Sequence, residues 1–389
     1  MRLLFITTRS PLSSLERDGG TTFATQLIRH LAPLCSLEIL FLREHDYALS
    51  LLPNVKAVYF LSPDTSIANR FLRRMNTAAS VEQWIGTRHP NYDAILIQHV
   101  SGGFGFAGLP ESARRKMVIF PMFTGVAYTR SGEVVPEAYL AAEKRVLLSA
   151  GLVICPSHSE SNDLVTGYGL DKSFIRHAPF GLDLDTYRYC PRILAGKKAV
   201  LLYVATIKIQ KNQLDCIPLA ARLLQLGIDP VIHLAGGIGD SSYHARLMDE
   251  IGENNFQDRI IYHGLLDKTE IAGLAAGCHF SISTAHWETF GIAMLESLAM
   301  GLPVLVYGDI DCLWEQLYPD LGCIGVERSP DAMAWRIASF YSDPAGYASR
   351  SSRSPQQVAH LAEDIVMKGI FHQIKKLSNA CSTPGAIIG

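Results

Sequence analysis

The fold of this chain is decided by one segment, Cys278-His-Phe-Ser-Ile-Ser283-Thr-Ala-His-Trp-Glu288-Thr-Phe-Gly-Ile-Ala-Met-Leu-Glu296-Ser-Leu-Ala-Met-Gly301-Leu-Pro303-Val-Leu-Val-Tyr307. The short β-prone runs 278–283 and 303–307 are typical of buried parallel strands. Between them Thr289 is a suitable N-cap residue, and the apolar residues at 292, 295 and 298 predict a helix. Gly301 and Pro303 fit the end of that helix. The segment therefore predicts one β-α-β unit.

The start of this helix is also the predicted ligand position. In open parallel α/β sheets, ligands bind just beyond the carboxyl ends of the strands. We expect the backbone N–H groups of Phe290, Gly291 and Ile292 to point to that place, beside the positive end of the helix dipole. Such a position suits a phosphate group or sugar hydroxyls.

Length and composition describe a globular chain with two domains. The 389 residues suit two domains of about 150–200 residues each. Apolar residues make up 48% and charged residues 19%, and the net charge of −2 gives no general attraction to nucleic acid or membranes. No apolar run approaches the roughly 20 residues of a membrane-spanning helix. The apolar run at the amino terminus is too short for a signal peptide and predicts a strand.

The eight cysteines are scattered without a Cys-x-x-Cys pair, and several lie in apolar runs. We interpret them as reduced thiols of a cytoplasmic protein. No cluster of His, Cys and Asp has metal-ligand spacing, and no Asp-x-Asp sequence indicates a diphosphate anchored through a metal. The sequence therefore predicts no metal site.

Alternating strand and helix signals continue through the chain and predict parallel sheets covered by helices on both faces. In the first half, strands are predicted at residues 3–8, 37–42, 55–60, 94–98, 116–120, 152–155 and 174–178, and helices at 21–31, 80–88, 137–148 and 159–168. In the second half, strands at 199–204, 230–234 and 259–262 and a helix at 268–276 precede the opening segment. These elements predict a first domain at 1–185, a linker at 186–198, a second domain at 199–355 and a helical tail at 356–389.

Glu288-x7-Glu296, with Phe-Gly inside it and Ala-Met-Gly-Leu-Pro-Val behind it, resembles the Glu-x7-Glu segment of the family four retaining glycosyltransferases, group 1 enzymes with the GT-B fold. The resemblance spans residues 150–325, where 179–183 is similar to the family's Pro-Asn-Gly-Val-Asp turn, with Phe180 in place of Asn. It implies an α/β fold class with two Rossmann-like, doubly wound parallel-sheet domains and a last helix that crosses back to the first domain. It also implies that Glu288 holds donor-sugar hydroxyls and that Glu296 holds the ribose hydroxyls of the nucleotide.

The same resemblance implies groups that bind the donor diphosphate. Lys211 holds the position of a family lysine that reaches the diphosphate, whereas Thr206 replaces the family's Arg and Asn212 a more usual Gly. A cation at this place would neutralise the charge that develops on the leaving diphosphate. Lys208 or helix N-termini could compensate for the missing Arg. Gly20, in a Gly-Gly loop after the first strand, is a further expected contact to the diphosphate.

The nucleotide is expected along two turns of the second domain. In the family, the counterpart of turn 235–239, here with Gly236 and Gly237, lines the nucleotide side, although this turn lacks the Gly-x-Gly-x-x-Gly spacing. The base is expected near 263–266, which includes Leu265, where backbone groups would bind it. A purine and a pyrimidine are equally compatible with these residues.

The first domain is expected to bind the acceptor. His99 follows strand 94–98 on the ligand side and is a candidate for touching the sugar, with a histidine satisfied in the core as the equal alternative. The family's His-Asp pair after the next strand is absent, because this chain has Phe120-Pro-Met-Phe-Thr-Gly125 there. The Gly- and aromatic-rich segments 101–106 and 123–134 fit either a sugar-like acceptor or plain loops. The basic residues at 70, 73, 74 and 114–116 indicate either a solvated face or contact with an anionic membrane surface.

Together these features predict a cytoplasmic, metal-independent, retaining hexosyltransferase with possible peripheral contact at the inner membrane face and no nucleic-acid partner. It would transfer a sugar from a UDP or GDP donor, without a further cofactor, to a hydroxyl of a glycan, a lipid-linked saccharide or a small-molecule glycoside. We expect Glu288, Lys211 and His99 to act in catalysis. A degenerate GT-B protein that binds sugar without transferring it is one alternative. A nucleotide-cofactor oxidoreductase is another, but it needs a Gly-x-Gly-x-x-Gly followed by an acidic residue, and neither half has this motif.

Overall fold

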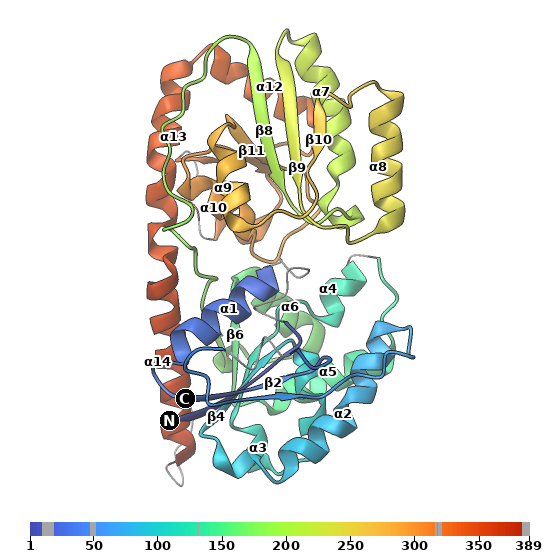
Figure 1. The fold of residues 1–389 in the computed structure, drawn as a ribbon, viewed down its shortest axis with the longest axis vertical. Helices are drawn as coiled ribbons and strands as arrows, with labels where there is room; N and C mark the ends of the chain where they lie inside the picture. The colour runs from blue at the N-terminus through green and yellow to red at the C-terminus, as the bar shows by residue number, and fades with distance from the viewer. Residues whose placement is uncertain (10–18, 47–51, 131, 316, 318–320, 383–389) are drawn as a thin grey trace. The chain divides into compact units, whose positions relative to one another are not determined.

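The computed structural model describes residues 1–9, 19–46, 52–130, 132–315, 317 and 321–382 (Figure 1). Its internal contacts divide the chain into two compact units. The first unit comprises Met1–Gly181 together with Asp364–Gly389, and the second comprises Leu182–Glu363. Each unit is built around one parallel sheet, as the alternating sequence pattern predicts.

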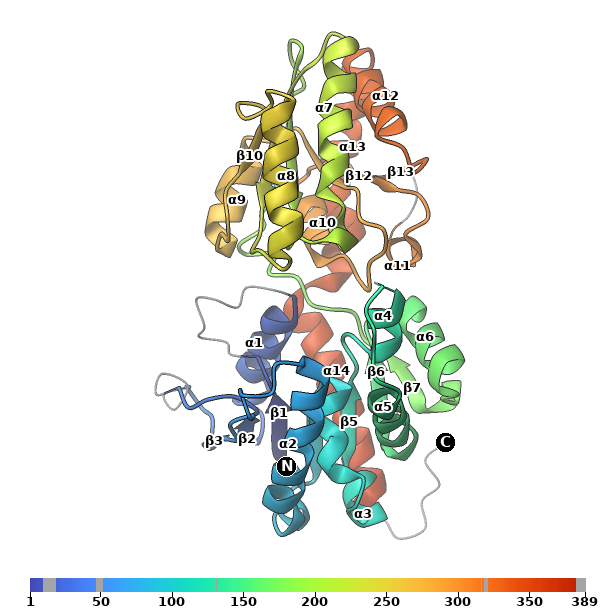
Figure 2. The same cartoon turned by 90° about the vertical axis from the view of Figure 1, so that its right-hand side faces the viewer.

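The first unit contains a seven-stranded sheet in the order β3-β2-β1-β4-β5-β6-β7. Its strands are β1 (Arg2–Thr7), β2 (Ser36–Phe41), β3 (Ala57–Phe60), β4 (Ala94–Gln98), β5 (Met117–Phe120), β6 (Leu152–Cys155) and β7 (Ile175–His177). Its helices are α1 (Gly19–Leu31), α2 (Arg70–Gly86), α3 (Glu111–Arg114), α4 (Gly125–Arg130), α5 (Glu137–Ser149), α6 (His158–Tyr168) and α14 (Glu363–Ser382). In the two views, α2 and α5 lie on one side of this sheet and α14 on the other (Figures 1 and 2).

The second unit contains a six-stranded sheet in the order β10-β9-β8-β11-β12-β13. Its strands are β8 (Lys198–Val204), β9 (Asp229–Ala235), β10 (Ile260–Tyr262), β11 (Phe280–Ser283), β12 (Val304–Tyr307) and β13 (Cys323–Val326). Its helices are α7 (Cys216–Gln225), α8 (Ser241–Glu253), α9 (Lys268–Ala276), α10 (Ile292–Ala299), α11 (Asp311–Trp314), α12 (Pro330–Tyr341) and α13 (Pro344–Val358). Here α7 and α8 lie on one side of the sheet, and α10 and α13 lie on the other (Figure 2).

Four inner strands of the two sheets are buried along their full length, because helices cover both faces. Every residue of β4 and β5 in the first unit and of β11 and β12 in the second is buried. Strands in such a position favour apolar side chains on both faces. β5 and β12 are continuous apolar runs, whereas β11 alternates Phe280 and Ile282 with buried serines. This is why the sequence pattern located these strands well, and the predicted fold class is confirmed by the two parallel sheets.

The predicted N-cap of α10 is wrong. The helix begins at Ile292, and Gly291 is its N-cap residue with a φ of +81°. A Cβ at Gly291 would lie 2.6 Å from Leu313 Cδ2 and 2.7 Å from Met294 Cε. Both the left-handed backbone and the close packing therefore require glycine. Because that backbone conformation interrupts a right-handed helix, Thr289 lies in the preceding loop and not at the helix start.

α2 and β13 also differ from the sequence prediction. α2 begins at Arg70, well before the predicted start at residue 80, because Asn69 caps it. The Asn69 Oδ1 atom accepts hydrogen bonds from Phe71 N at 3.0 Å and from Leu72 N at 3.1 Å. The edge strand β13 was not predicted. It is short and includes Gly325, which weakens a strand signal.

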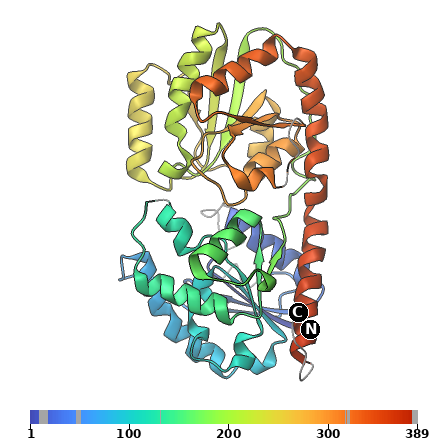
Figure 3. The ribbon, with the colours of Figure 1, turned by 180° about the vertical axis from the view of Figure 1, so that it is seen from behind.

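The predicted helical tail at 356–389, of which residues 383–389 lie outside the described part of the chain, is interrupted in the structure. α13 ends at Val358, a 3-10 turn covers Ala359–Leu361, and α14 begins at Glu363 (Figure 3). Leu182 forms a parallel bridge with Ala362 at this break. Leu182 N donates to Leu361 O at 2.7 Å, and Glu363 N donates to Leu182 O at 3.0 Å. At the break, the backbone is thus hydrogen-bonded to Leu182, where the chain enters the second unit.

Candidate active site

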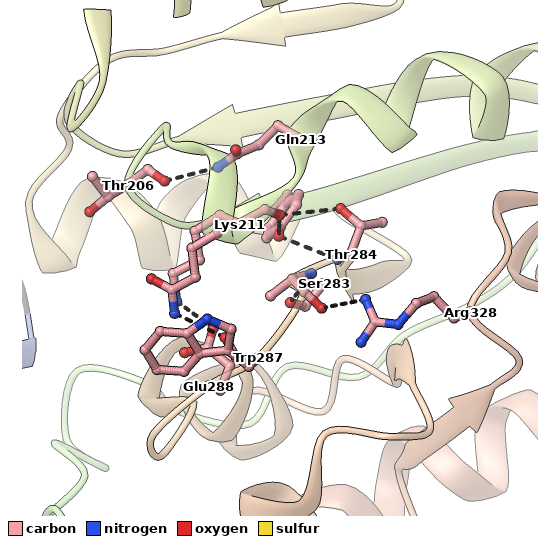
Figure 4. Close-up of polar contacts among 11 residues, drawn as sticks. Thr206, Lys211, Gln213, Ser283, Thr284, Trp287, Glu288 and Arg328 are labelled. Carbon is pink, nitrogen blue, oxygen red and sulfur yellow. Dashed lines mark hydrogen bonds and ion pairs between the residues drawn. The ribbon is translucent and has the colours of Figure 1, made fainter. Parts of the chain in front are cut away.

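Lys211 and Glu288, which the sequence placed separately on the ligand side, meet in the structure. Lys211 Nζ lies 2.5 Å from Glu288 Oε1, and their side chains are 15% and 11% exposed. Lys211 ends a 3-10 turn after β8, and Glu288 lies in the loop between β11 and α10. Because β8 and β11 are neighbours in a parallel sheet, their carboxyl ends bring the two loops together. Figure 4 shows the two side chains pointing toward one another.

The two loops are also joined by hydrogen bonds around Gln210. His286 N donates to Gln210 O at 2.8 Å, and Gln210 Nε2 donates to Trp287 O at 2.9 Å. On the same side, Thr284 Oγ1 donates to Asn212 O at 2.6 Å. The backbone on either side of the Lys211–Glu288 pair is therefore fixed by contacts between the loops.

A buried phenol completes this connection. The Tyr203 hydroxyl donates to Lys211 O and accepts from Thr284 N at 3.3 Å. Burial raises the pKa of Tyr203 above its ordinary range, so the phenol stays neutral. One side chain from β8 thus contacts the backbone of both loops.

Asn212 departs from the glycine that is commoner in the resembling family, and its conformation explains why Asn is tolerated. Asn212 has φ +52° and ψ +46°, in the left-handed region. Asn adopts this region more readily than most residues other than glycine. Thr206, which replaces the family's Arg, is packed closely, because a Cβ at Gly239 would lie 2.6 Å from Thr206 Cγ2.

The predicted nucleotide turns lie against one another. The Gly236 N–H donates to Gly264 O at 2.8 Å, and a Cβ at Gly236 would lie 2.1 Å from Ala205 O. The backbone of this turn therefore approaches the loop after β8 too closely for any other residue. A Cβ at Gly237 would lie 3.8 Å from Leu265 Cδ1, an ordinary van der Waals distance. The structure thus brings Gly236, Gly237 and Leu265 together.

Glu296 projects from α10 into a polar group of side chains. Its carboxylate accepts a hydrogen bond from the Tyr187 hydroxyl. Burial raises the pKa of Glu296 to about 7, and the charge of Asp183 adds to this effect, whereas Lys268 and the Tyr187 hydrogen bond oppose it. Lys268 Nζ lies 3.5 Å from Asp183 Oδ2. Glu296 is therefore a carboxyl group that titrates near neutral pH.

In the first unit, a buried hydrogen-bond chain positions Gly20. Thr7 Oγ1 donates to Gln98 Oε1 at 2.5 Å, and Gln98 Nε2 donates to Gly20 O at 2.7 Å. Thr7 and Gln98 end the neighbouring strands β1 and β4. The start of α1, where Gly20 lies, is thus fixed to the carboxyl edge of the first sheet.

His99 follows Gln98 at the same edge. It has a φ of +70°, and its side chain is only 6% exposed. Burial lowers the pKa of His99 well below its ordinary value, and the charges of Arg74 and Arg9 act in the same direction. A neutral, buried imidazole agrees with the core alternative, and contact between His99 and a sugar stays a prediction.

The loop after β5, where the resembling family has its His-Asp pair, is held instead by a buried carboxyl group. Glu143 is 1% exposed and accepts hydrogen bonds from Gly125 N at 2.8 Å and from the Tyr168 hydroxyl. Burial raises the pKa of Glu143 to about 7, although both hydrogen bonds and the charge of Arg74 oppose the shift. Glu143 therefore anchors the start of α4.

Several of these groups were not identified from the sequence: Tyr203, Gln210, Thr284, Tyr187, Lys268 and Asp183. Their partners are distant in the chain, as for Gln210 and Trp287 or Lys268 and Asp183. In the part of the chain that the structure describes, no group of three or more His, Cys, Asp or Glu residues could hold a metal ion. No helix among the described residues is both long and apolar enough to cross a membrane.

Comparison with known proteins connects the second unit to one family. Residues 192–357 match the model of the family described as glycosyl transferases group 1. The GDP-mannose-dependent alpha-(1-6)-phosphatidylinositol dimannoside mannosyltransferase of Mycobacterium tuberculosis is 28% identical over 188 residues, which cover 46% of this chain and 47% of that protein. The chain spans about half the length of the curated relatives it matches.

Solved structures resemble nearly the whole chain. The sucrose-phosphate synthase of Thermosynechococcus elongatus has a TM-score of 0.78 at 18% identity, covering 98% of this chain and 100% of that chain. HepE of Anabaena, in complex with UDP and glucose, has a TM-score of 0.76 at 16% identity, covering 97% and 100%. These likenesses show the fold. The predicted resemblance to group 1 glycosyltransferases is confirmed by the family match over residues 192–357, and the predicted GT-B fold class is confirmed by these solved structures.

Proposed function

We propose that this chain is a retaining glycosyltransferase that moves a hexose from a nucleoside-diphosphate sugar to a hydroxyl acceptor. The observation that carries the proposal is the Lys211–Glu288 pair at the carboxyl edge of the second sheet, inside the segment that matches the family. Both side chains lie where open α/β sheets bind ligands. A cation beside a carboxylate suits a donor whose diphosphate is negative and whose sugar carries hydroxyls.

In this proposal each site residue acts on a different part of the donor. Lys211 and the helix N-termini would stabilise the negative charge that develops on the leaving diphosphate. Glu288 would accept hydrogen bonds from sugar hydroxyls, and Glu296 from the ribose hydroxyls. The bond between the anomeric carbon and the phosphate oxygen breaks while a bond to the acceptor oxygen forms on the same face. The leaving phosphate takes the acceptor's proton, so the anomeric configuration is kept. No metal is needed in this scheme, because Lys211 supplies the positive charge.

The donor and acceptor are proposed by class. The names of similar proteins mention GDP-mannose in one case and UDP with glucose in another, which supports a GDP or UDP donor. We propose a glycan, a lipid-linked saccharide or a small-molecule glycoside as acceptor, bound by the first unit with His99 at its ligand edge. We place Gly20, Gly236, Gly237, Leu265 and the backbone of Phe290, Gly291 and Ile292 on the donor.

A cytoplasmic location with peripheral membrane contact is part of the proposal, and the basic residues of the first unit are the candidates for that contact. Arg74 donates to the hydroxyls of Tyr128 and Tyr139, and Lys116 donates to two backbone carbonyls, so these two cations are engaged inside the first unit. Arg114 Nη1 also donates to a backbone carbonyl, Ala107 O, at 3.5 Å. Arg73 is therefore the better candidate. Co-sedimentation with anionic vesicles, compared between the natural chain and R73E, tests the contact.

A second candidate function is sugar binding without transfer. It is favoured by Thr206 in place of the family's Arg and by the missing His-Asp pair. A thermal-shift screen with UDP-, GDP- and TDP-sugars identifies the donor, since a ligand stabilises the folded state by mass action. Release of free nucleotide with the best donor then decides between the two candidates. Turnover, including slow hydrolysis, supports the enzyme, whereas binding without any turnover supports the sugar-binding protein. Failure to bind any nucleotide sugar contradicts both.

A further inference from the structure

Arg328, which follows β13, holds the loop that carries Glu288 from a second side. Its Nη2 donates to His286 O at 2.9 Å, and its Nη1 donates to Ala285 O at 3.3 Å. Its Nη1 also lies 3.4 Å from His286 Nδ1. In Figure 4, Arg328 lies on the opposite side of Ser283 and Thr284 from Lys211.

The guanidinium group of Arg328 is itself fixed in orientation. Asp309, just after β12, accepts from its Nε at 2.8 Å and from its Nη2 at 2.7 Å. Such a two-point pair between a guanidinium and a carboxylate fixes the plane of the cation. The guanidinium carbon also lies 4.9 Å from the centre of the Tyr307 ring, and Tyr307 is fully buried. Arg328 thus connects the ends of β12 and β13 to the loop after β11.

The acceptors on the loop are mainly backbone carbonyls, so Arg328 acts on the path of the chain. Gln210 contacts the backbone of His286 and Trp287 from the other side. The residues directly before Glu288 are therefore clamped between Gln210 and Arg328. A displacement of about 1 Å in a group that positions a substrate can slow a reaction by about 100-fold.

We propose that Arg328 is a positioning residue that places the Glu288 carboxylate through the backbone of residues 285–287. Arg328 does not contact the donor in this proposal. The inference rests on the proposed function, in which Glu288 binds the donor sugar. It separates two parts of donor recognition, because Glu296, which would hold the ribose, lies on α10 outside the clamped loop.

The kinetic test compares R328A with R246A. Arg246 pairs with Glu250 on the surface of α8, and its side chain is 68% exposed, so R246A controls for the loss of an arginine from the same unit. For R328A we expect turnover of the nucleotide sugar to fall by about 10–100-fold. The affinity for the free nucleotide, measured by calorimetry, should stay unchanged in both variants. R328K should recover little, since one ammonium group cannot contact Asp309 and both carbonyls together. Full turnover in R328A, or an equal loss of free-nucleotide affinity, would overturn the proposal.

A double-mutant cycle tests whether Arg328 acts through Glu288. If it does, E288Q/R328A should be no slower than E288Q alone, to within about threefold, because the second change removes nothing further. Multiplied losses would show that Arg328 acts elsewhere.

A measurement that needs no activity tests the loop itself. In protein labelled with 5-fluorotryptophan, the fluorine resonance of Trp287 is identified by its absence in W287F. We expect R328A to shift or broaden this resonance and to leave that of Trp84, in the first unit, unchanged. An unchanged Trp287 resonance would contradict the positioning role even if the proposed function holds. Conversely, a natural chain that binds no nucleotide sugar would contradict the proposed function while this measurement still decides the role of Arg328 in the loop.

Discussion

The hydroxyl of Tyr187, from the first turns of the second unit, donates a hydrogen bond to the carboxylate of Glu296 on α10. Tyr187 is 3% exposed, so this contact is shielded from water. The hydrogen bond favours the ionised carboxylate, whereas burial favours the neutral acid. The balance leaves the pKa of Glu296 at about 7, where a modest change in pH alters its charge.

We therefore predict that nucleotide affinity depends on Glu296 and falls in acid. Below pH 7 the carboxyl group gains a proton and loses the stronger, charge-assisted hydrogen bonds to the ribose. E296A should weaken nucleotide binding by about 10–100-fold at pH 8, corresponding to about 1.5–3 kcal/mol. Calorimetry with free UDP or GDP between pH 5.5 and 8 measures both effects.

Two variants distinguish this from titration of the nucleotide itself. E296Q should remove the part of the pH dependence that belongs to the protein. Y187F should move the loss of affinity to higher pH, because the carboxylate loses a donor that stabilises its charge. The ribose role is refuted if folded E296A binds the free nucleotide as tightly as the natural chain.

Lys211 and Glu288 should each raise the rate of sugar transfer, and their ion pair should stabilise the folded protein. K211A and E288Q should each reduce the rate of sugar transfer by about 10²–10³-fold, the usual effect of losing a group that stabilises developing charge. Each single change should also lower the melting temperature, because the remaining side chain is mostly buried and then has no charge partner.

The double variant K211M/E288Q should recover part of the melting temperature but none of the activity, since no unpaired charge remains. K368A is the matched control, because Lys368 and Asp364 form an exposed pair with side chains 75% and 57% exposed. Unchanged transfer in either single variant would remove that residue from the site. A melting temperature that collapses in the double variant would make the pair structural.

Glu143 should make the first unit less stable as pH rises. Its pKa of about 7 in the folded protein lies above the ordinary glutamate value of 4.5, so the folded protein binds more protons between these values. Stability therefore falls as pH rises from about 4.5 to about 7 and changes little beyond that. The neutral variant E143Q lacks this decline. As pH rises, its free energy of unfolding should therefore increase relative to that of the natural chain by up to about 3 kcal/mol. Urea unfolding at pH 5 and pH 8 measures the difference. A gap between the two proteins that is the same at both values would show that Glu143 does not titrate in the folded state.

Transfer activity should survive exhaustive dialysis against EDTA. In the proposed reaction Lys211 carries the positive charge that a metal supplies in other enzymes. Initial rates before and after dialysis test this. An enzyme that loses activity and regains it with Mn²⁺ or Mg²⁺ would contradict the metal-independent scheme.

The strands at the centre of the sheets could be predicted because their burial on both faces leaves a continuous apolar run, as in β4 and β12. The start of α10 could not, because Thr289 is as good a cap in sequence as Gly291. Only the contact with Leu313 and Met294 shows why the glycine begins the helix. Local propensity was overruled by packing between distant segments.

Lys211 and Glu288 were each proposed as site residues because short motifs around them resemble those of the family, but neither their pairing nor the groups that position them were predicted. The Tyr203 hydroxyl accepts a hydrogen bond from the backbone N–H of Thr284. Arg328 donates to the carbonyl of Ala285, which lies 43 positions earlier in the chain. Every residue has a backbone carbonyl, so the residue type does not indicate which carbonyl accepts a side-chain hydrogen bond. Such partners can therefore be found only once the fold has brought the segments together.

The hydrogen bonds between Leu182 and the residues before α14 have a consequence for how the protein could be divided into fragments. The second unit is one uninterrupted stretch, Leu182–Glu363, inserted into the first, and its two ends lie side by side. We therefore expect that residues 182–363 can be expressed as a single fragment. The two pieces of the first unit can be spliced by a short loop that replaces the insertion. The chain passes between the two units twice, so a protease that cuts only one of these two connections would leave the units joined by the other.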